Sequence, residues 1–352
     1  IAGDNTWNWI ASGPLLMRGI QLDGSRGTLA MVLQIFTVGL AALIPLSAGA
    51  DRWRLRSICI STALFAGVSY PLFAHWVWGG GWLRTSEIFK SPGFQDPGGA
   101  STIHVLGGLT ALAIAWILGP RRGKYGPDDR PVAIPGHNIV YVLFGCALLL
   151  PGWLALNAVG SILFAGMAPG KVPLIFANTL LCAAGSFLTS LILTRIRFLK
   201  PDASLCANGW VGGLVASSAV CCYVPPVGAL LTGLIAGLLV SFSVEWIEAH
   251  LRTDDPGGAI SVHAVAGIWG LMAVGILPHL SPAGWVVPDN ELAQSIGILT
   301  LLGAMLPIAY GMNWLLDRTD PQRVEDRSRR KGMDLHELGG VAYPEFVIQA
   351  ED

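Results

Sequence analysis

The sequence predicts an all-α polytopic membrane protein built from inverted repeats, and three observations carry this prediction. The 352-residue chain is 53% hydrophobic and only 13% charged, whereas a soluble domain carries about 25% charged residues. Nine apolar stretches reach the length of about 20 residues that crosses a bilayer. One nine-residue phrase occurs twice, as D-P-G-G-A-S-T-I-H at 96–104 and as D-P-G-G-A-I-S-V-H at 255–263.

The nine candidate spans follow one another with short links. They cover residues 27–50, 57–82, 100–119, 137–166, 171–195, 203–222, 226–246, 258–278 and 292–317. The links leave no room for a soluble domain, so we expect one transmembrane domain at 1–317 and a polar cytoplasmic tail at 318–352. No signal-peptide pattern precedes the first span.

Lysine and arginine gather in alternate links and in the tail, and basic links face the cytoplasm. The basic positions that set the orientation are Arg52, Arg54, Arg56, Arg121, Arg122, Lys124, Arg195, Arg197, Lys200, Arg318, Arg323, Arg327, Arg329, Arg330 and Lys331. We therefore expect a multi-pass protein of the cell (inner) membrane, with its N-terminus outside and its C-terminus inside. The two copies of the repeated phrase then run antiparallel, as in transporters whose site lies between inverted repeats.

Bulk composition gives no indication of other partners or cofactors. The formal net charge of −1 does not point to nucleic acid. The six cysteines lie mostly in apolar runs without C-x-x-C pairs, so neither a zinc site nor a disulfide framework is predicted.

Each repeat copy begins with an Asp-Pro pair. Asp is a strong helix cap and Pro suits the first helical position, so Asp96-Pro97 and Asp255-Pro256 predict helix starts. Capping alone explains these residues, and a carboxylate that shapes the mouth of a cation pathway explains them as well. Both interpretations stay open.

Each copy ends with a histidine eight residues after its aspartate, about 12 Å along a helix. This places His104 and His263 in the apolar zone, where ionisable residues are candidates for function. A lone histidine there is usually a packing residue, but two at matching repeat positions favour a shared role. Neutral imidazoles hydrogen-bond each other and a small polar passenger, and they shuttle protons.

Tryptophans gather in A-H-W-V-W-G-G-G-W-L at 74–83, at the outer end of the second span. They fit an interfacial aromatic belt. A tryptophan face beside a cation entrance also attracts the cation, by up to about 2 kcal/mol when it is desolvated.

Together these residues resemble the ammonium transporter family (Amt/Mep/Rhesus) from about residue 27 to the tail. The matching elements are A-H-W-V-W-G-G-G at 74–81, the two Asp-x7-His phrases, H-N-I at 137–139, G-W-L-A-L-N-A at 152–158, D-D-P at 254–256 and G-M-D-L-H-E-L-G-G-V-A-Y at 332–343. Trp78 favours the Amt branch. The spans match the third to eleventh of the family, so the first two are expected to be lacking.

The resemblance implies the inverted-repeat ammonium transporter fold and a homotrimer in the bilayer with one pore per subunit. It assigns ammonium recruitment to Trp78 and Asp96, and a narrow hydrophobic pore to the twin histidines His104 and His263, with Trp153 nearby. In the family mechanism ammonium separates into ammonia and a proton, and both are conducted. A bare ammonium ion in a dry pore costs many kcal/mol, whereas neutral ammonia costs little.

The chain departs from the family pattern at the outer gate. Leu156 stands where the second gate phenylalanine is expected, and Thr37 takes the first position unless Phe36 fills it with a one-residue shift. Gly160, next to Ser161, aligns with the recruitment-site serine.

Two further departures lie in the span at 203–222 and in the tail. Asn208 and Trp210 occupy positions that are usually small in the family. In the tail, Leu338 and Gly340 replace the usual His and Glu. These replacements weaken the inference of a P-II signal protein at the cytoplasmic face.

The favoured function is ammonium transport across the cell membrane. The altered gate motivates a first alternative, an ammonium-sensing or non-conducting family member, and a Rhesus-like ammonia or gas channel is a second. A membrane enzyme with the two histidines as metal ligands is the weakest alternative, because no third ligand recurs at matching depth. We therefore predict no enzyme, no metal site and no cofactor.

Overall fold

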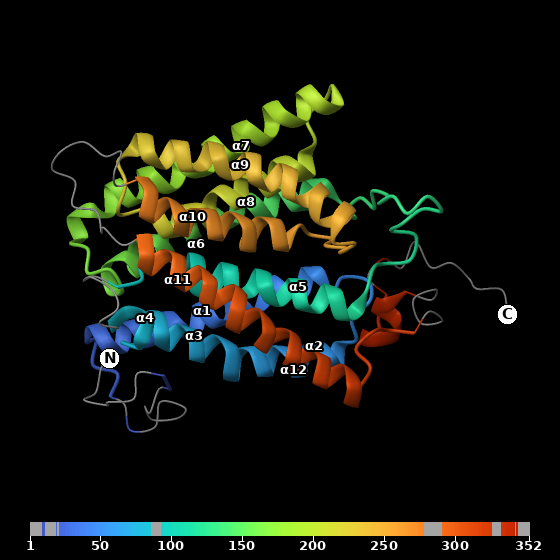
Figure 1. Ribbon diagram of the computed structural model, residues 1–352, viewed down its shortest axis with the longest axis horizontal. Helices are drawn as coiled ribbons and strands as arrows, with labels where there is room; N and C mark the ends of the chain where they lie inside the picture. The colour runs from blue at the N-terminus through green and yellow to red at the C-terminus, as the bar shows by residue number, and fades with distance from the viewer. Residues whose placement is uncertain are drawn as a thin grey trace.

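The computed structural model describes residues 9–10, 19, 21–85, 93–277, 291–325, 332–341 and 343. Over these residues the protein is a bundle of long helices lying side by side, and they contain two isolated bridges but no strand. The links between helices gather at the two ends of the bundle (Figure 1). This confirms the predicted all-α class.

The first half of the bundle consists of α-helices with π-helical segments inserted. Its elements are α1 (Arg26–Ala48), α2 (Leu55–Leu64), the π-helical η2 (Phe65–Ser69), α3 (Tyr70–Val77), α4 (Trp82–Thr85), the π-helical η3 (Ala100–Val105) and α5 (Leu106–Leu118).

The second half continues in the same way. Its elements are α6 (Ile139–Leu163), a short 3₁₀ turn (Pro169–Lys171), α7 (Val172–Phe198), α8 (Ala203–Val220), α9 (Pro226–His250), the π-helical η5 (Ile260–Val265), α10 (Ala266–Ile276), α11 (Glu291–Thr300), the π-helical η7 (Leu301–Met305), α12 (Leu306–Thr319) and, in the tail, the π-helical η8 (Asp334–Leu338).

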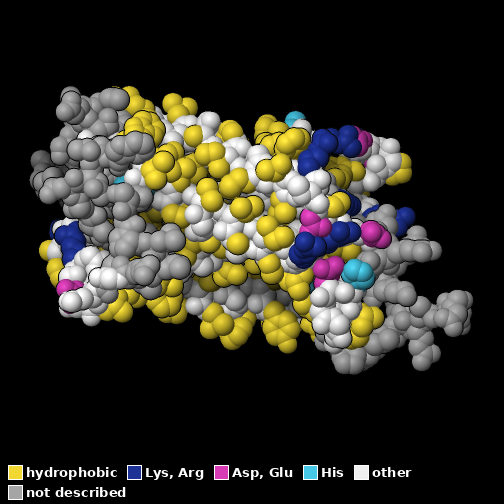
Figure 2. Space-filling model, turned by 90° about the horizontal axis from the view of Figure 1, so that it is seen from below, with side chains coloured by type: hydrophobic (Ala, Val, Ile, Leu, Met, Phe, Trp, Pro, Cys, Tyr) yellow, Lys and Arg dark blue, Asp and Glu magenta, His cyan; other side chains and the backbone are white. Residues whose placement is uncertain are grey.

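Most of the helices are long enough to cross a bilayer. Eight helices among the described residues are long and apolar enough to cross a membrane, and Ile260–Ile276 is a shorter apolar helix. These nine segments coincide with the nine predicted spans. In Figure 2 hydrophobic side chains cover the middle of the visible face, and many charged side chains gather at one end.

The two repeat copies pack against each other in opposite directions. In Figure 1, α5 runs toward the end that holds the 119–138 link, whereas α10 runs away from that end. The segments η3 and η5 are in contact near the middle of the bundle. The predicted antiparallel arrangement therefore brings the ends of the two phrases together.

The helices begin later than the Asp-Pro pairs predicted. The first copy becomes helical at Ala100, after Gly99 in the left-handed region (φ 87°), and the second at about Ile260. Pro97 is therefore in a turn and not at the first helical position. The capping part of the prediction is right, because Asp96 still accepts hydrogen bonds from the first helical turn.

Two matching glycines let the repeat helices approach closely. A Cβ on Gly108 would lie 2.5 Å from the Ala264 nitrogen, and one on Gly267 would lie 2.6 Å from the Val105 side chain. Each glycine comes four residues after its histidine, so each close contact lies about one helical turn from the histidine of its own copy.

Candidate functional site: the paired histidines and their approaches

The two repeat histidines form a direct pair. Their Nδ1 atoms lie 3.2 Å apart, and the ring centroids are 5.3 Å apart with 19° between the planes. His104 is fully buried, whereas His263 is half-buried. A neutral pair at this distance requires one Nδ1 to donate and the other to accept. Among the described residues nothing hydrogen-bonds the buried Nε2 of His104.

Trp153 fixes the plane of the first imidazole. Its ring stacks on His104 with centroids 4.8 Å apart and only 8° between the planes. Its Nε1 donates to Ser218 Oγ at 2.9 Å, which locks the indole in turn. The sequence placed Trp153 near the pore, and the structure brings it to the ring face of His104.

Asp96 caps η3 with one carboxylate oxygen. Its Oδ2 accepts from the backbone N–H and hydroxyl of both Ser101 and Thr102, at 2.5–3.0 Å. Its buried Oδ1 has no partner among the described residues. Burial raises the pKa of this carboxyl, although the hydrogen bonds act in the opposite direction.

Trp78 lies against the same turn. Its Nε1 donates to the Asp96 carbonyl oxygen at 2.7 Å, and its ring stacks on Phe164 at 4.2 Å with 6° between the planes. Trp78 and Asp96 are thus brought together as predicted. Phe164 was missed, because nothing in the sequence marks this residue at the end of α6 as a partner of a tryptophan so distant in the chain.

The altered gate residues lie in one apolar hollow between α1 and α6. Phe36, Leu156 and Trp153 line this hollow of about 490 Å³, which includes neither Trp78 nor Asp96. Phe36 is 71% exposed, so it lies on the surface of α1. Thr37 is buried, and its hydroxyl shares a 2.5 Å hydrogen bond with the Tyr70 hydroxyl.

Gly160 is a point of close backbone packing. A Cβ there would lie 2.2 Å from the Pro97 carbonyl oxygen, so this glycine holds α6 against the turn that carries Asp96. Ser161 is fully buried, and its hydroxyl lies 3.6 Å from Cys221 Sγ. Neither residue has a described hydrogen bond to Trp78 or Asp96.

A buried ion-pair cluster lies at the start of the second repeat copy. Asp254 accepts from the backbone N–H and the guanidinium of Arg121 at 2.7–3.0 Å, and Arg52 lies 3.6 Å away. Burial acts to raise the pKa of Asp254, but the hydrogen bonds from Arg121 and the charge of Arg52 bring it below its usual range. The sequence analysis singled out Arg52, Arg121 and the D-D-P motif separately, but it could not predict that they meet, because the three charges come from three separate links.

The tail begins by packing on this cluster. The backbone of residues 322–324 pairs with that of 52–54, with Val324 donating to the Arg52 carbonyl at 2.9 Å. Arg323 donates to the Leu118 and Pro120 carbonyls at the end of α5. The chain just after α12 is therefore fixed to the α1–α2 link and to the end of α5, both in the first half of the bundle.

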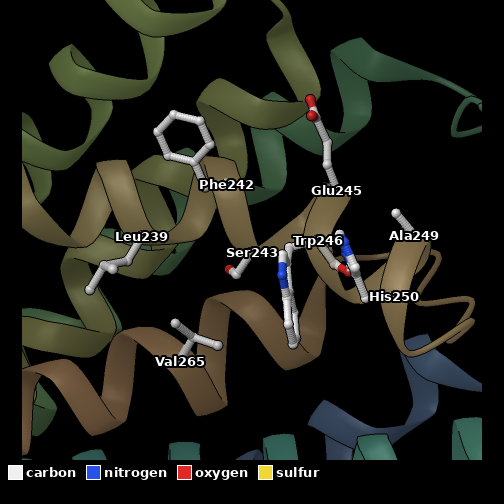
Figure 3. A pocket seen from close by; sticks show the side chains of 8 residues that line it. All are labelled: Leu239, Phe242, Ser243, Glu245, Trp246, Ala249, His250 and Val265. Carbon is white, nitrogen blue, oxygen red and sulfur yellow. Dashed lines mark hydrogen bonds between the residues drawn. The ribbon is translucent and has the colours of Figure 1, made fainter.

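Two more hollows lie toward the end of the bundle that holds the basic links. One of about 340 Å³ lies between α1, α6 and α8 and is lined by Trp153, His263 and Asn208, among others. The other, of about 460 Å³, is lined by α9 and Val265, and there the Trp246 and His250 rings stack at 5.1 Å (Figure 3). Across the described residues no three His, Cys, Asp or Glu side chains are grouped to hold a metal ion.

Comparisons with known proteins show the family and the fold of the chain. A sequence profile described as Ammonium Transporter Family matches residues 2–343. The ammonium transporter Amt2 of Archaeoglobus fulgidus is 35% identical over an alignment of 364 positions, which covers 99% of this chain and 75% of that protein. The ammonium transporter Amt1 of Methanocaldococcus jannaschii is 32% identical over 327 residues, covering 92% of this chain and 79% of its own length.

Solved structures share the fold. A protein described as a sensor Amt protein superposes with a TM-score of 0.80 at 27% identity, over 94% of this chain and 84% of its own. The Rh50 protein of Nitrosomonas europaea superposes with a TM-score of 0.69 at 24% identity, over 90% and 76% of the two chains. The second likeness shows the fold alone.

Proposed function

The chain belongs to the ammonium transporter family, whose members are membrane transporters and not enzymes, and we propose that it conducts ammonia and a proton through its twin-histidine pore. The observation that carries the proposal is the buried imidazole pair, 3.2 Å between Nδ1 atoms, with an unpartnered Nε2 on His104. An unpartnered buried nitrogen costs stability unless a passenger satisfies it.

Recruitment takes place beside the first repeat copy. The Trp78 indole donates to the backbone carbonyl oxygen of Asp96 at 2.7 Å, so its ring lies against the turn that carries the buried Asp96 carboxyl. A cation gains from the ring face and from the negative charge, while Phe164 holds the ring flat. Ammonium binds there and gives up its proton before it enters the apolar segment.

The imidazole pair then carries the proton separately from ammonia. If His104 bears its proton on Nδ1 and donates to His263 Nδ1, its Nε2 is free to accept a proton. Acceptance at His104 Nε2 passes the Nδ1 proton to His263, which releases its own Nε2 proton on the far side. Charge crosses along the rings and neutral ammonia crosses beside them, so no bare ammonium enters the dry zone.

We also propose how the protein is oriented in the membrane and how it assembles. The end with Arg52 and Arg121 faces the cytoplasm by the positive-inside rule, which puts Trp78 outside and the tail inside. A homotrimer in the cell membrane and a tail domain from 318 belong to the same proposal. A P-II signal protein remains a candidate partner of the tail. The inference is weakened by Leu338 and Gly340, which replace the His and Glu that are usual in the tail of the family.

The test is ammonium-evoked current on a solid-supported membrane, with purified protein in liposomes. The unchanged protein is expected to give a saturable current, and His104→Ala is expected to lose it. His250→Ala is the matched control, because His250 is an exposed histidine in the separate hollow of Figure 3. A current of unchanged size in a folded His104→Ala protein would refute the histidine pathway.

Sensing is the second candidate function. It is favoured by the likeness to a sensor Amt protein and by Leu156 and Gly160 in place of family gate and site residues. Saturable ammonium binding to a folded protein that carries no current would support sensing. An ammonia flux that saturates without any current would instead favour the Rhesus-like channel.

A further inference from the structure

A cavity on the inner side of the histidine pair contains a polar group that the proposed pathway does not use. This cavity of about 340 Å³ is reached by His263, the half-buried member of the pair, and by Trp153. The polar side chains on its wall are Ser47, Cys146, Asn208 and His263, and the other lining residues are apolar. Among the described residues no charged side chain lines it.

Asn208 is the side chain there without an internal partner. Ser47 Oγ hydrogen-bonds the Ile44 carbonyl within α1, but no described residue hydrogen-bonds the Asn208 carboxamide. The amide is half-buried on α8, at the edge of the cavity. A carboxamide offers two donors and an acceptor, and on this half-buried side chain they are open to water or to a ligand in the cavity.

The backbone of the second repeat copy holds Asn208 in place. A Cβ on Gly258 would lie 2.5 Å from Asn208 Nδ2, so only a glycine leaves room for the amide at this turn. Gly258 also has a φ of +69°, which suits glycine. The amide is thus positioned against the turn whose helix carries His263 five residues later.

The chemistry of the cavity fits a small nitrogen species. The amide oxygen accepts from an N–H of ammonia or ammonium, and the amide N–H donates to the lone pair of ammonia. An apolar wall without cationic side chains neither repels ammonium nor competes for it. An anion finds no positive charge on this wall.

We propose that the Asn208 carboxamide is the inner binding group for the transported nitrogen, directly after His263 on the way to the cytoplasm. This inference rests on the proposed function. It gives the pathway two different ends: an aromatic and acidic site outside, and a neutral amide site inside. Asn208 is a binding residue for the passenger and takes no part in proton transfer between the rings.

The experiment compares the half-saturating ammonium concentration from each side of the membrane. Right-side-out and inside-out proteoliposomes are given ammonium jumps, and currents are recorded for the unchanged protein and for Asn208→Leu. Loss of one hydrogen bond raises the inner half-saturating concentration by about fivefold, while the outer value stays unchanged. Asn208→Asp keeps an acceptor oxygen and is expected to hold the inner value at or below that of the unchanged protein.

Ser243→Ala is the matched control. Ser243 lines the separate hollow of Figure 3 and hydrogen-bonds only the Val240 carbonyl of its own helix, so both half-saturating concentrations should stay unchanged. Equal inner values for Asn208→Leu and the unchanged protein would overturn the inference, as would an equal rise on both sides. Absence of current in the unchanged protein would instead refute the proposed function and, with it, this inference.

Discussion

The two copies of the repeated phrase share a sequence but have different surroundings. In the copy at 96–104, called the outer copy because the proposed orientation puts it outside, Asp96 accepts four hydrogen bonds from two hydroxyl residues, and the Trp78 indole donates to its backbone carbonyl. In the inner copy, Ile260 replaces the first of those residues, and Asp255 accepts its backbone N–H at 2.7 Å. The duplicated turn is therefore a common capping device, and the residues around it give each end its role.

The neighbours of the two turns differ in charge. The inner turn follows Asp254, which binds Arg52 and Arg121 from two other links. The outer turn has no such cluster among the described residues. The inner copy is therefore tied by buried ion pairs to the links that carry Arg52 and Arg121, whereas the outer copy has no such ties among the described residues.

The largest expected effect comes from breaking the inner anchor. Asp254→Ala leaves two buried guanidinium groups without their carboxylate, and removal of one partner of a buried ion pair costs about 3–5 kcal/mol. Thermal unfolding of the purified protein should show a marked fall in Tm. Asp129→Ala is the control, because Asp129 pairs with Arg252 at the surface, where a salt bridge contributes at most about 1 kcal/mol. Equal effects of the two changes would contradict the anchoring role.

The second expected effect is a pH dependence of the free energy of unfolding that arises from Asp255 in the inner turn. Burial raises the pKa of Asp255 to about 6 from 3.8. Because the folded protein favours the protonated form of Asp255, this group contributes its full stability below about pH 4. That contribution is lost as the pH rises through about 6 and the carboxyl ionises. The free energy of unfolding of Asp255→Asn, relative to the unchanged protein, should therefore increase by about 2 kcal/mol between pH 4 and pH 7.

The control for this pH effect is Asp128→Asn, which changes an exposed carboxylate. Parallel pH profiles for Asp255→Asn and the unchanged protein would show that Asp255 does not titrate in this range.

The sequence predicted the outline of both ends but not their contacts. Hydropathy, basic links and the repeated phrase predict nine segments and an antiparallel pair, because these properties are local. The π-helical starts, the Gly108 and Gly267 crossing, and the Asp254 cluster depend on residues that are distant in the chain. The roles of the site residues stay predictions, although Trp78 with Asp96, and His104 with His263, are found together as the sequence suggested.

The third prediction concerns the missing outer hydroxyl. The family pattern suggests that Gly160→Ser should restore a recruitment group, but the added Cβ would lie 2.2 Å from the Pro97 carbonyl. We expect a loss of about 1–3 kcal/mol of stability from overpacking, and no gain in apparent ammonium affinity. Gly152→Ser is the control, since a Cβ there meets nothing within 4 Å. A stable Gly160→Ser protein with a lower half-saturating concentration would show that the turn can move to admit the hydroxyl.

The fourth and smallest effect separates the two aspartates by function. Asp96→Asn removes the negative charge beside Trp78, and a charged hydrogen bond contributes about 1.4 kcal/mol or more. The half-saturating ammonium concentration applied from outside should rise about tenfold. Asp255→Asn, the same change in the inner copy, should leave that outer value unchanged. If both variants shift it equally, the carboxylates act only as caps, and the difference between the two ends must lie in the aromatic residues around Trp78.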